Sequence, residues 1–198
     1  MLWCSGTFRQ SETRLEEAKD IAKKTFRFYG IELRPIGPWD LPALRRWRNS
    51  PEINKNMLDT SFITPQRQRQ WYQSIIDRED QAHWVVWCQG QRAGYSNVKG
   101  DGPLYKQQKV EVGGYIGASG VRHVLLGYAL VMSQLDVAFE HIGVEEVQIF
   151  IKGNNERLIQ FNEKIGYCPT LKTAEGIFLS LREKDYQVSK KRMLKYFK

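Results

Sequence analysis

Residues 110–167 carry the pattern that decides the fold, and they read VEVGGYIGASGVRHVLLGYALVMSQLDVAFEHIGVEEVQIFIKGNNERLIQFNEKIGY. Val110–Gly117 is a short apolar run of β-forming residues with three glycines, which predicts a strand with a bulge or a close backbone approach. Ala118–Val121 is a turn of small residues, and a helical pattern starts at Arg122. The run therefore begins as a strand that leads through a short turn into a long helix.

The second half of the run repeats this arrangement. The first helix carries one apolar stripe as far as Ile142, and Gly143 is the residue type expected at its C-terminal end. Val147–Ile151 reads as a second buried strand, and another helix follows Asn155. A strand–helix–strand–helix order makes the two strands parallel neighbours.

The start of the first helix is a candidate anion site. Its first N–H groups lack partners within the helix, and the helix dipole favours negative charge there. Arg122 adds a cation at the same end. Every unit of this kind presents a helix N-terminus, so an ordinary surface helix start is the alternative at this point.

The composition indicates one globular domain. The chain has 198 residues, of which 41% are hydrophobic and 26% charged, and it contains no apolar run close to the ~20 residues of a membrane span. Three scattered cysteines, Cys4, Cys88 and Cys168, and three distant histidines suggest neither a disulfide framework nor a metal site. We expect a protein of the reducing cytoplasm with no metal.

Around the central run, the sequence predicts further elements. They are strands over 31–36, 81–89, 92–99, 168–173 and 176–181 and helices over 40–49, 64–77 and 183–197. We expect residues 31–198 to form one domain and residues 1–30 to be a helical extension that packs on it or on a second subunit. Ser11 would cap that helix, and Leu15, Ala18, Ile21, Ala22 and Phe26 would form its apolar stripe.

The central run resembles the acetyl-CoA-binding core of the GNAT superfamily of N-acetyltransferases. Their signature, Arg/Gln-x-x-Gly-x-Gly/Ala, aligns without a gap on Arg122–Gly127, and the downstream match covers Asn154–Arg157 and Phe161–Tyr167. The resemblance implies an α/β/α sandwich with a mixed sheet of about seven strands, flanked by helices and splayed at the acetyl-CoA site. Two positions depart from the signature, because Leu125 replaces its first glycine and Asn162 replaces a tyrosine taken as the proton donor.

A wider match runs from about Ile31 and includes Trp47–Pro51. It is similar to the branch that acetylates the 4-amino group of UDP-linked sugars, as in pseudaminic acid synthesis. That similarity implies acetyl-CoA as acyl donor and a small-molecule amino-sugar nucleotide as acceptor. It implies roles in acetyl-CoA binding for Ile116, Gly117, Arg122, His123, Val124, Leu125, Leu126, Gly127, Tyr128, Asn155 and Lys164.

The same resemblance suggests three catalytic residues. Glu111 is the candidate base, directly or through a water. Tyr115 would position the acceptor, and the Asn162 amide would hydrogen-bond the leaving thiolate. A backbone N–H within Val112–Gly114 would bind the oxyanion. A solvent-facing carboxylate and a packing tyrosine are the plain alternatives for the first two.

The acceptor side has five candidates, which are Arg48, Met57, Gln68, Trp71 and Lys99. Their alternatives are a helix-end arginine, a loop residue covering the core, ordinary packing and a surface lysine. The net charge of +8 suits a polyanionic ligand. Acetyl-CoA and a nucleotide sugar fit that charge, as does nucleic acid, although no RNA-binding signature is present. Two further functions stay open, which are a ribosomal-protein-like N-terminal acetyltransferase and a degenerate non-catalytic acyl-CoA binder. A homodimer is possible, and no membrane association is expected.

Overall fold

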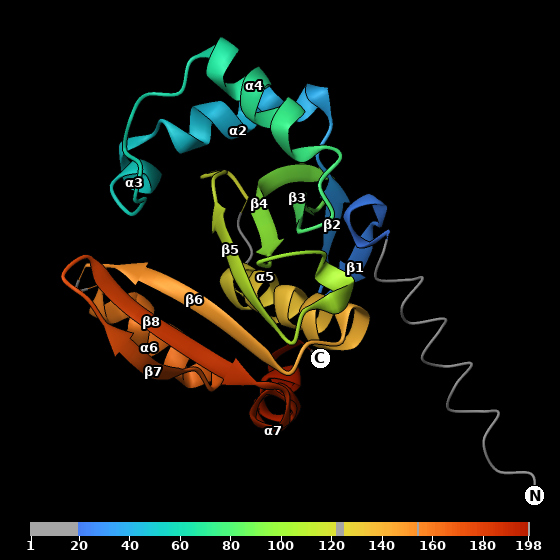
Figure 1. Cartoon of the computed structure of the whole chain (residues 1–198), viewed down its shortest axis with the longest axis vertical. Helices are drawn as coiled ribbons and strands as arrows, with labels where there is room; N and C mark the ends of the chain where they lie inside the picture. Colours follow the sequence, from blue (N-terminus) through green and yellow to red (C-terminus); the bar gives the residue numbers. More distant parts are fainter. Residues whose placement is uncertain (1–19, 122–124, 154, 198) are drawn as a thin grey trace, which may run out of the picture.

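The computed structural model describes residues 20–121, 125–153 and 155–197. Eight strands form one sheet in the order β1-β2-β3-β4-β5-β6-β8-β7 (Figure 1). They are β1 (Phe26–Phe28), β2 (Ile31–Pro35), β3 (Gln81–Cys88), β4 (Gln91–Lys99), β5 (Lys109–Ile116), β6 (Glu146–Lys152), β7 (Cys168–Lys172) and β8 (Gly176–Arg182). The expected sandwich with a mixed sheet is confirmed, with one strand more than the predicted seven.

Helices cover both faces of the sheet (Figure 1). They are α2 (Leu41–Arg48), α3 (Pro51–Asn54), α4 (Pro65–Ile75), α5 (Leu126–Asp136), α6 (Glu156–Ile165) and α7 (Glu183–Met193). Apolar residues of α5, α6 and α7 join the main core on one face. Residues of α2 to α4 pack with Val85, Tyr95 and Tyr115 in a smaller core on the other face. The alternating side-chain directions of β3 to β5 thus supply two separate cores.

Local signals placed several boundaries correctly. The Thr64 side chain accepts a hydrogen bond from Arg67 N at 3.2 Å and caps α4, and Gly143 ends the first long helix with φ +87°. The β3–β4 hairpin turns at Gln89 and Gly90, both with positive φ, which is the geometry that a two-residue hairpin favours.

The two parallel strands of the central unit separate along their length. Parallel pairing joins Lys109–Glu111 to residues 146–148 only, although β5 continues to Ile116 and β6 to Lys152. Figure 1 shows β5 and β6 diverging from their common start. The predicted splay is therefore confirmed, and in the described residues the later part of β5 has no strand partner on its β6 side.

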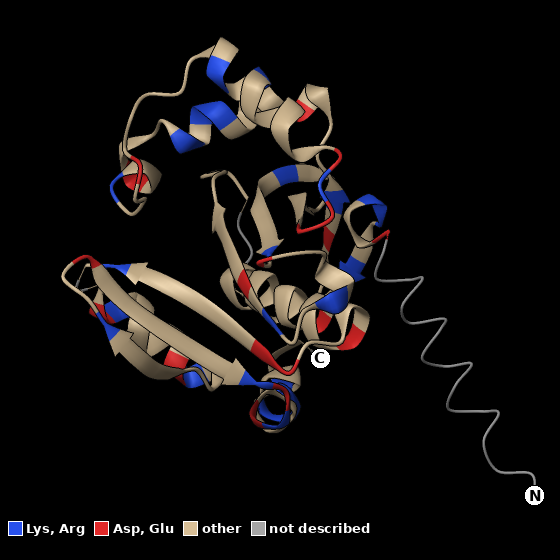
Figure 2. Cartoon of the chain, viewed as in Figure 1, with Lys and Arg blue, Asp and Glu red and all other residues tan. Residues whose placement is uncertain are grey.

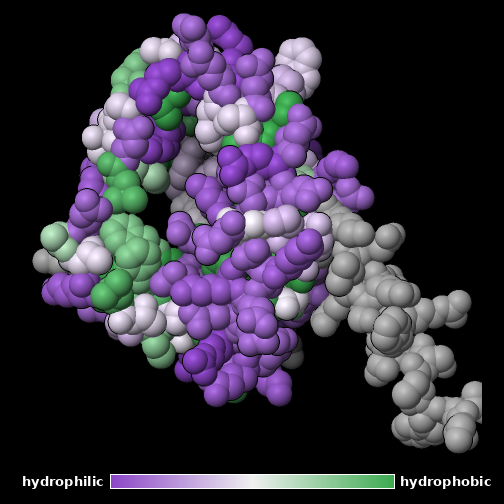
Figure 3. Space-filling model, in the orientation of Figure 1, coloured by the Kyte–Doolittle hydropathy of each residue, from purple (hydrophilic) through white to green (hydrophobic). Residues whose placement is uncertain are grey.

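Apolar side chains lie on the free face of the second half of the sheet. Phe150 of β6 and Phe178 of β8 face each other across the strands with ring centroids 4.8 Å apart. Figure 3 shows hydrophobic surface over β6 and β8 beside a hollow in the molecule. The opening between the two halves of the sheet thus has one apolar wall.

The structure differs from two local predictions. Phe26 lies on β1 rather than on a helix, because it pairs with Leu33 and its ring packs edge-on against Trp84 at 6.0 Å. The helix expected from Arg122 begins at Leu126, and its last part, Val137–Ile142, is a π-helix. Residues 1–19, with Ser11, Leu15 and Ala18, lie outside the described residues.

Two side chains have other surroundings than expected. Asp40 occupies the N-cap position of α2, but its carboxylate accepts from Arg92 Nε at 2.6 Å and from Gly37 N at 2.9 Å instead of capping the helix. Leu158, Phe161 and Ile165 have the spacing of one apolar stripe on α6, which predicts that all three are buried, but Leu158 is 39% exposed. The contact between Asp40 and Arg92 joins residues that are 52 positions apart, and a local pattern does not reveal such a contact.

A buried carboxylate at the end of α5 links the β1–β2 turn to α7. Asp136 is 1% exposed and accepts hydrogen bonds from Tyr29 in the β1–β2 turn and from Tyr186 and Lys190 of α7, the last at 2.8 Å. Burial opposes it, but hydrogen bonds to Asp136 and Glu140 raise the pKa of Lys190. We call these four residues, Tyr29, Asp136, Tyr186 and Lys190, the Asp136 cluster.

Candidate functional site

A cavity of about 430 Å³ lies between α2, α4 and strands β4 and β5. Its lining combines cationic, carboxylate, aromatic and aliphatic side chains. The residues are Leu44, Arg48, Met57, Asp59, Ile63, Arg67, Gln68, Trp71, Tyr95, Asn97, Lys99, Glu111, Gly113, Gly114 and Tyr115. We call it the acceptor cavity, because all five residues that the sequence suggested for the acceptor side line it.

The floor of the acceptor cavity follows from strand register. Tyr95, Asn97 and Lys99 of β4 pair directly with Tyr115, Gly113 and Glu111 of β5. Alternate residues of a strand share one face, so these six positions form two adjoining rows. Gly113 has no side chain, and the Asn97 side chain takes that space, since a Cβ at Gly113 would lie 2.9 Å from Asn97 Oδ1. Gly113 lies in β5 after the pairing with β6 has ended.

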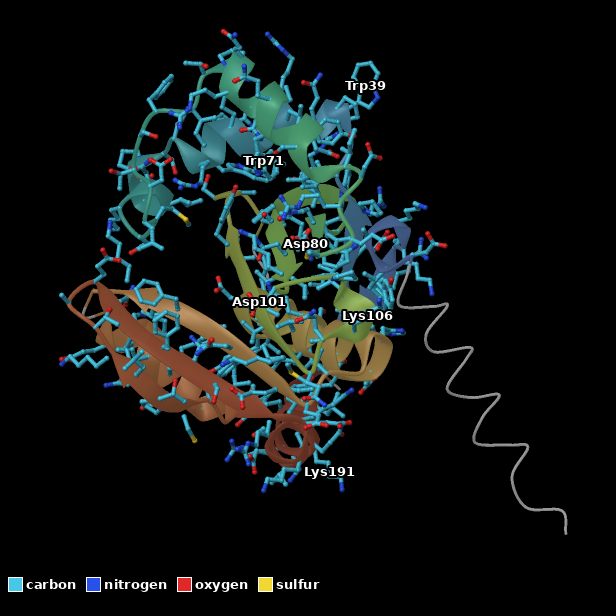
Figure 4. All side chains as sticks on the ribbon, viewed as in Figure 1. Trp39, Trp71, Asp80, Asp101, Lys106 and Lys191 are labelled. Carbon is cyan, nitrogen blue, oxygen red and sulfur yellow. The ribbon has the colours of Figure 1, made fainter. Side chains whose placement is uncertain are left out.

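The walls come from α2, α4 and the loop between α3 and α4. Trp71 projects from α4 toward the sheet, whereas Trp39 points away from the body of the protein (Figure 4). Arg48 Nη2 donates to Asp59 O at 2.6 Å, while its Nη1 is buried and has no hydrogen-bond partner among the described residues. A buried guanidinium nitrogen without a partner is costly, so this position suits an anionic or carbonyl group of a ligand.

Cationic side chains outnumber carboxylates around the acceptor cavity. Arg48, Arg67 and Lys99 face Asp59 and Glu111, and Figure 2 shows basic positions on both α2 and α4. Hydrogen bonds from Ser61 hold the pKa of Asp59 below its usual value, so that this carboxylate is ionised. The excess of positive charge favours an anionic ligand.

A hydrogen-bonded network lies beside the floor, where His83 of β3 pairs with Asn97 of β4. His83 Nδ1 is 2.7 Å from Tyr95 Oη, and His83 Nε2 is 3.0 Å from Gln81 Oε1. Asn97 Nδ2 donates to Tyr95 Oη at 2.9 Å. Burial lowers the pKa of His83 to about 4, with Lys99 acting in the same direction. Burial also raises the pKa of Tyr95 and of Tyr115, so in neutral solution the imidazole is uncharged and both phenols keep their protons.

The depressed pKa of His83 predicts an acid-sensitive fold. The unfolded chain binds a proton at this site below about pH 6.5, whereas the folded chain binds it only near pH 4. Between these values the unfolded state holds more protons, so we expect the unfolding free energy to fall by about 3 kcal/mol as pH drops from 7 to 4. Urea titrations across this range should show it, and the slope should be smaller in His83→Asn; equal slopes would contradict the assignment.

The acceptor cavity brings together seven of the residues singled out from sequence. They are Glu111, Tyr115, Arg48, Met57, Gln68, Trp71 and Lys99. Asn162 is not among its lining residues. It is buried on α6, and its Nδ2 donates to Leu158 O at 2.8 Å.

The candidates for acyl-donor binding lie along the end of β5 and the starts of two helices. Ile116 is the last residue of β5, and Gly117 follows it. A Cβ at Gly117 would lie 2.3 Å from the Trp47 ring. Leu126 is buried and Gly127 exposed in the first turn of α5. Asn155 caps α6 by accepting from Leu158 N at 3.2 Å.

A second cavity, of about 450 Å³, lies between α5, α6 and α7. Leu125, Tyr128 and Lys164 line it together with Glu163, Arg192, Met193 and Tyr196. Three of the predicted donor-binding residues therefore meet there. Arg122, His123 and Val124 lie outside the described residues.

Sequence reasoning missed several residues of the acceptor cavity. The missed lining residues are Asp59, Arg67, Tyr95 and Asn97. His83 lies next to the cavity, paired with Asn97. The period of two along β4 could have found Tyr95 and Asn97, because Lys99 was already a candidate on that strand. Asp59 and Arg67 lie where the loop meets α4, and they carry no comparable signal.

The described residues also bear on membrane insertion and on metal binding. In residues 20–121, 125–153 and 155–197, no helix is long and apolar enough to cross a membrane. The same part of the chain contains no group of three or more His, Cys, Asp or Glu side chains arranged to hold a metal ion.

Several solved structures share this fold. A structure described as apo FdhC, a nucleotide-linked sugar GNAT, aligns with a TM-score of 0.76 and 13% identity, over 88% of this chain and 99% of that one. Aminoglycoside acetyltransferase AAC(6')-Ib in complex with coenzyme A aligns with a TM-score of 0.67 and 18% identity, over 81% and 99%. An uncharacterized protein from Bacillus halodurans aligns with a TM-score of 0.70 and 13% identity, over 80% and 87%.

Sequence comparison gives the family. A search of curated proteins found no match. Residues 31–167 match the family model described as an acetyltransferase (GNAT) domain, which covers more than half of the chain and contains the splayed strands and the acceptor cavity. The chain therefore belongs to the GNAT acetyltransferase family.

Proposed function

We propose that this protein is an N-acetyltransferase that moves the acetyl group of acetyl-CoA to the primary amine of a nucleotide-linked amino sugar. The observation that supports this most is the charge and shape of the acceptor cavity, which adjoins the splayed part of β5. Three cations, an unpartnered Arg48 nitrogen and an aromatic wall suit a ligand with phosphates, a sugar and a base.

In this proposal, the acyl donor binds where β5 and β6 separate. Bound there, acetyl-CoA supplies a thioester whose carbonyl carbon is open to attack. The main chain of β5 beyond Glu111 has no strand partner on the β6 side. Gly113 O already accepts from Gln134 Nε2 at 2.6 Å, and the remaining free groups pair with the pantetheine amides as an added strand would. The predicted donor-binding residues Leu125, Tyr128 and Lys164 hold the nucleotide end at the second cavity.

Direct transfer through a ternary complex then needs little beyond correct placement. The amine nitrogen forms a bond to the carbonyl carbon, and the nitrogen gives up a proton. The carbon–sulfur bond breaks, and CoA leaves as a thiolate that takes up a proton from solvent. Glu111 accepts that proton, directly or through a water, while a backbone N–H at Gly113 binds the developing oxyanion. Holding both substrates in the reactive orientation lowers the activation free energy by up to ~7–11 kcal/mol in well-oriented systems.

The charge of the acceptor cavity separates two sugar classes. Aminoglycosides are polycations and call for a site rich in carboxylates. Here two carboxylates stand among three cations, which favours a nucleotide-linked acceptor. The FdhC structure, described as a nucleotide-linked sugar GNAT, has the higher TM-score of the two characterised neighbours, and at 13% identity that likeness supports the fold.

The decisive assay follows thiol release from acetyl-CoA. The full chain is incubated with a UDP-4-amino sugar, with an aminoglycoside, or with a peptide that starts with Ala or Ser. Release with the UDP-sugar alone supports the proposal. Release with either of the other amines, and none with the sugar nucleotide, overturns the acceptor assignment, and salt-sensitive RNA binding without acetyl-CoA binding overturns the enzyme assignment.

Removing the Arg48 guanidinium should weaken acceptor binding. We expect Arg48→Gln to raise the KM for the sugar nucleotide about 10- to 100-fold, because a charge-assisted hydrogen bond is lost, and to leave the KM for acetyl-CoA unchanged. Arg45→Gln is the matched control, since Arg45 lies on the same helix but outside the acceptor cavity. An unchanged acceptor KM in Arg48→Gln would remove Arg48 from the site.

A further inference from the structure

Tyr95 presents only a hydrogen-bond acceptor to the acceptor cavity. Gln81 Oε1 lies 3.0 Å from His83 Nε2, and a carbonyl oxygen accepts, so in the neutral ring Nε2 carries the proton. His83 Nδ1 is then an acceptor, and it takes the Tyr95 O–H at 2.7 Å. The Tyr95 oxygen also accepts from Asn97 Nδ2 at 2.9 Å. One lone pair of this oxygen therefore remains, and Tyr95 lines the cavity.

This arrangement depends on an uncharged His83. Lys99 of β4 and Arg78 oppose protonation of the ring, Asp80 favours it, and burial is the largest influence. Trp71 of α4 packs edge-on against the ring with centroids 5.6 Å apart. A protonated ring would donate from both nitrogens and turn the Tyr95 O–H toward the cavity. Burial thus keeps the polarity of Tyr95 constant.

The position of Tyr95 matches the needs of the reaction. It lies two residues from Asn97, which pairs across the strands with Gly113, and four residues from Lys99, which pairs with Glu111. An amine that attacks a thioester must be uncharged and must aim its lone pair at the carbonyl carbon, so its N–H bonds need acceptors elsewhere. The free lone pair of Tyr95 supplies such an acceptor on the same face as Glu111.

We propose that Tyr95 Oη accepts a hydrogen bond from the attacking amine and orients it, and that His83 is a positioning residue that holds Tyr95 in this acceptor state. The inference rests on the proposed acetyl transfer to a primary amine. It applies to whichever amine the protein acetylates, so it does not depend on the sugar.

The tautomer of His83 tests the first half directly and needs no substrate. In the full chain, nitrogen-15 NMR of the imidazoles from pH 5 to 8 should show a His83 ring with a proton on Nε2 and none on Nδ1. The signal is assigned by its absence in His83→Asn, and it should move in Tyr95→Phe. A proton on Nδ1, or a charged ring at pH 7, would overturn the inference even if acetyl transfer is confirmed.

Kinetics with the amine that the wild-type chain acetylates test the second half. Tyr95→Phe should lower kcat/KM for the amine about tenfold and leave the KM for acetyl-CoA unchanged. His83→Leu should do the same, and the double variant should be no slower than Tyr95→Phe alone, because His83 acts through Tyr95. Additive losses would overturn the coupling. Tyr72→Phe, on α4 outside the cavity, is the matched control.

A conservative variant and the pH profile complete the test. The amide oxygen of His83→Asn reaches the place of Nδ1 and can accept the Tyr95 proton, so this variant should recover most of the activity that His83→Leu loses. The shape of kcat/KM against pH above pH 5 should match that of the wild type. Failure of the rescue, or the loss of one limb of the profile, would overturn the positioning role.

Discussion

Replacing Glu111 with glutamine is expected to lower kcat for acetyl transfer about a hundredfold, the usual contribution of a positioned proton acceptor. Glu111 lines the acceptor cavity opposite Lys99 and is the last β5 residue paired with β6. Glutamine keeps the size of the side chain but cannot take up the proton of the attacking amine. The cavity and the splay should stay as they are, so acetyl-CoA affinity should be unchanged.

Steady-state rates and calorimetry with acetyl-CoA check this expectation together. Glu145→Gln is the matched control, because Glu145 is an exposed carboxylate just before β6 and outside both cavities. Wild-type turnover in Glu111→Gln would eliminate Glu111 as the base. A hundredfold loss of acetyl-CoA affinity with unchanged turnover at saturation would reassign it to donor binding.

Replacing Asp136 with alanine is expected to destabilise the fold by about 3–5 kcal/mol. The hydroxyls of Tyr29 and Tyr186 lose their shared acceptor, Lys190 keeps only Glu140, and a cavity opens. Asp136 accepts from Tyr29, Tyr186 and Lys190, so three elements lose a shared contact at once. The loss should be smaller in Asp136→Asn, whose amide oxygen can still accept from one of these donors.

Urea unfolding at pH 7, followed by tryptophan fluorescence, measures this effect. Asp101→Ala provides the control, because Asp101 is exposed in a loop (Figure 4) and should change the unfolding free energy by less than about 0.5 kcal/mol. If Asp136→Ala unfolds at the wild-type urea concentration, the Asp136 cluster does not stabilise the fold.

Short-range signals in the sequence located much of the site. The glycines in and just after β5, Thr64 before α4 and Gly143 after the first long helix act over a few residues, so pattern and residue type sufficed to place the strand and the helix ends. The splay followed from the resemblance to GNAT proteins. The resemblance to GNAT proteins named Arg48, Gln68, Trp71 and Lys99, and the structure collects all four in one cavity.

Long-range contacts account for what the sequence did not predict. The apolar spacing of Ile21, Ala22 and Phe26 also suits a helix, and only the pairing of β1 with β2 makes Phe26 a strand residue. His83 and Tyr95 are twelve residues apart, and they meet because of a hairpin whose register shifts after Val86. No local propensity encodes such a shift, so that network was invisible before the fold was known.

The short ladder between β5 and β6 has a mechanical consequence. Among the described residues, three pairs make up the strand pairing between the two halves of the sheet. The Asp136 cluster also links the first half, at the β1–β2 turn, to α7, which follows the last strand of the second half. A small change in the angle between the halves displaces the far ends of β5 and β6 more than their paired ends. Substitutions at Asp136 should therefore change how tightly the acyl donor is bound, although Asp136 lines neither cavity.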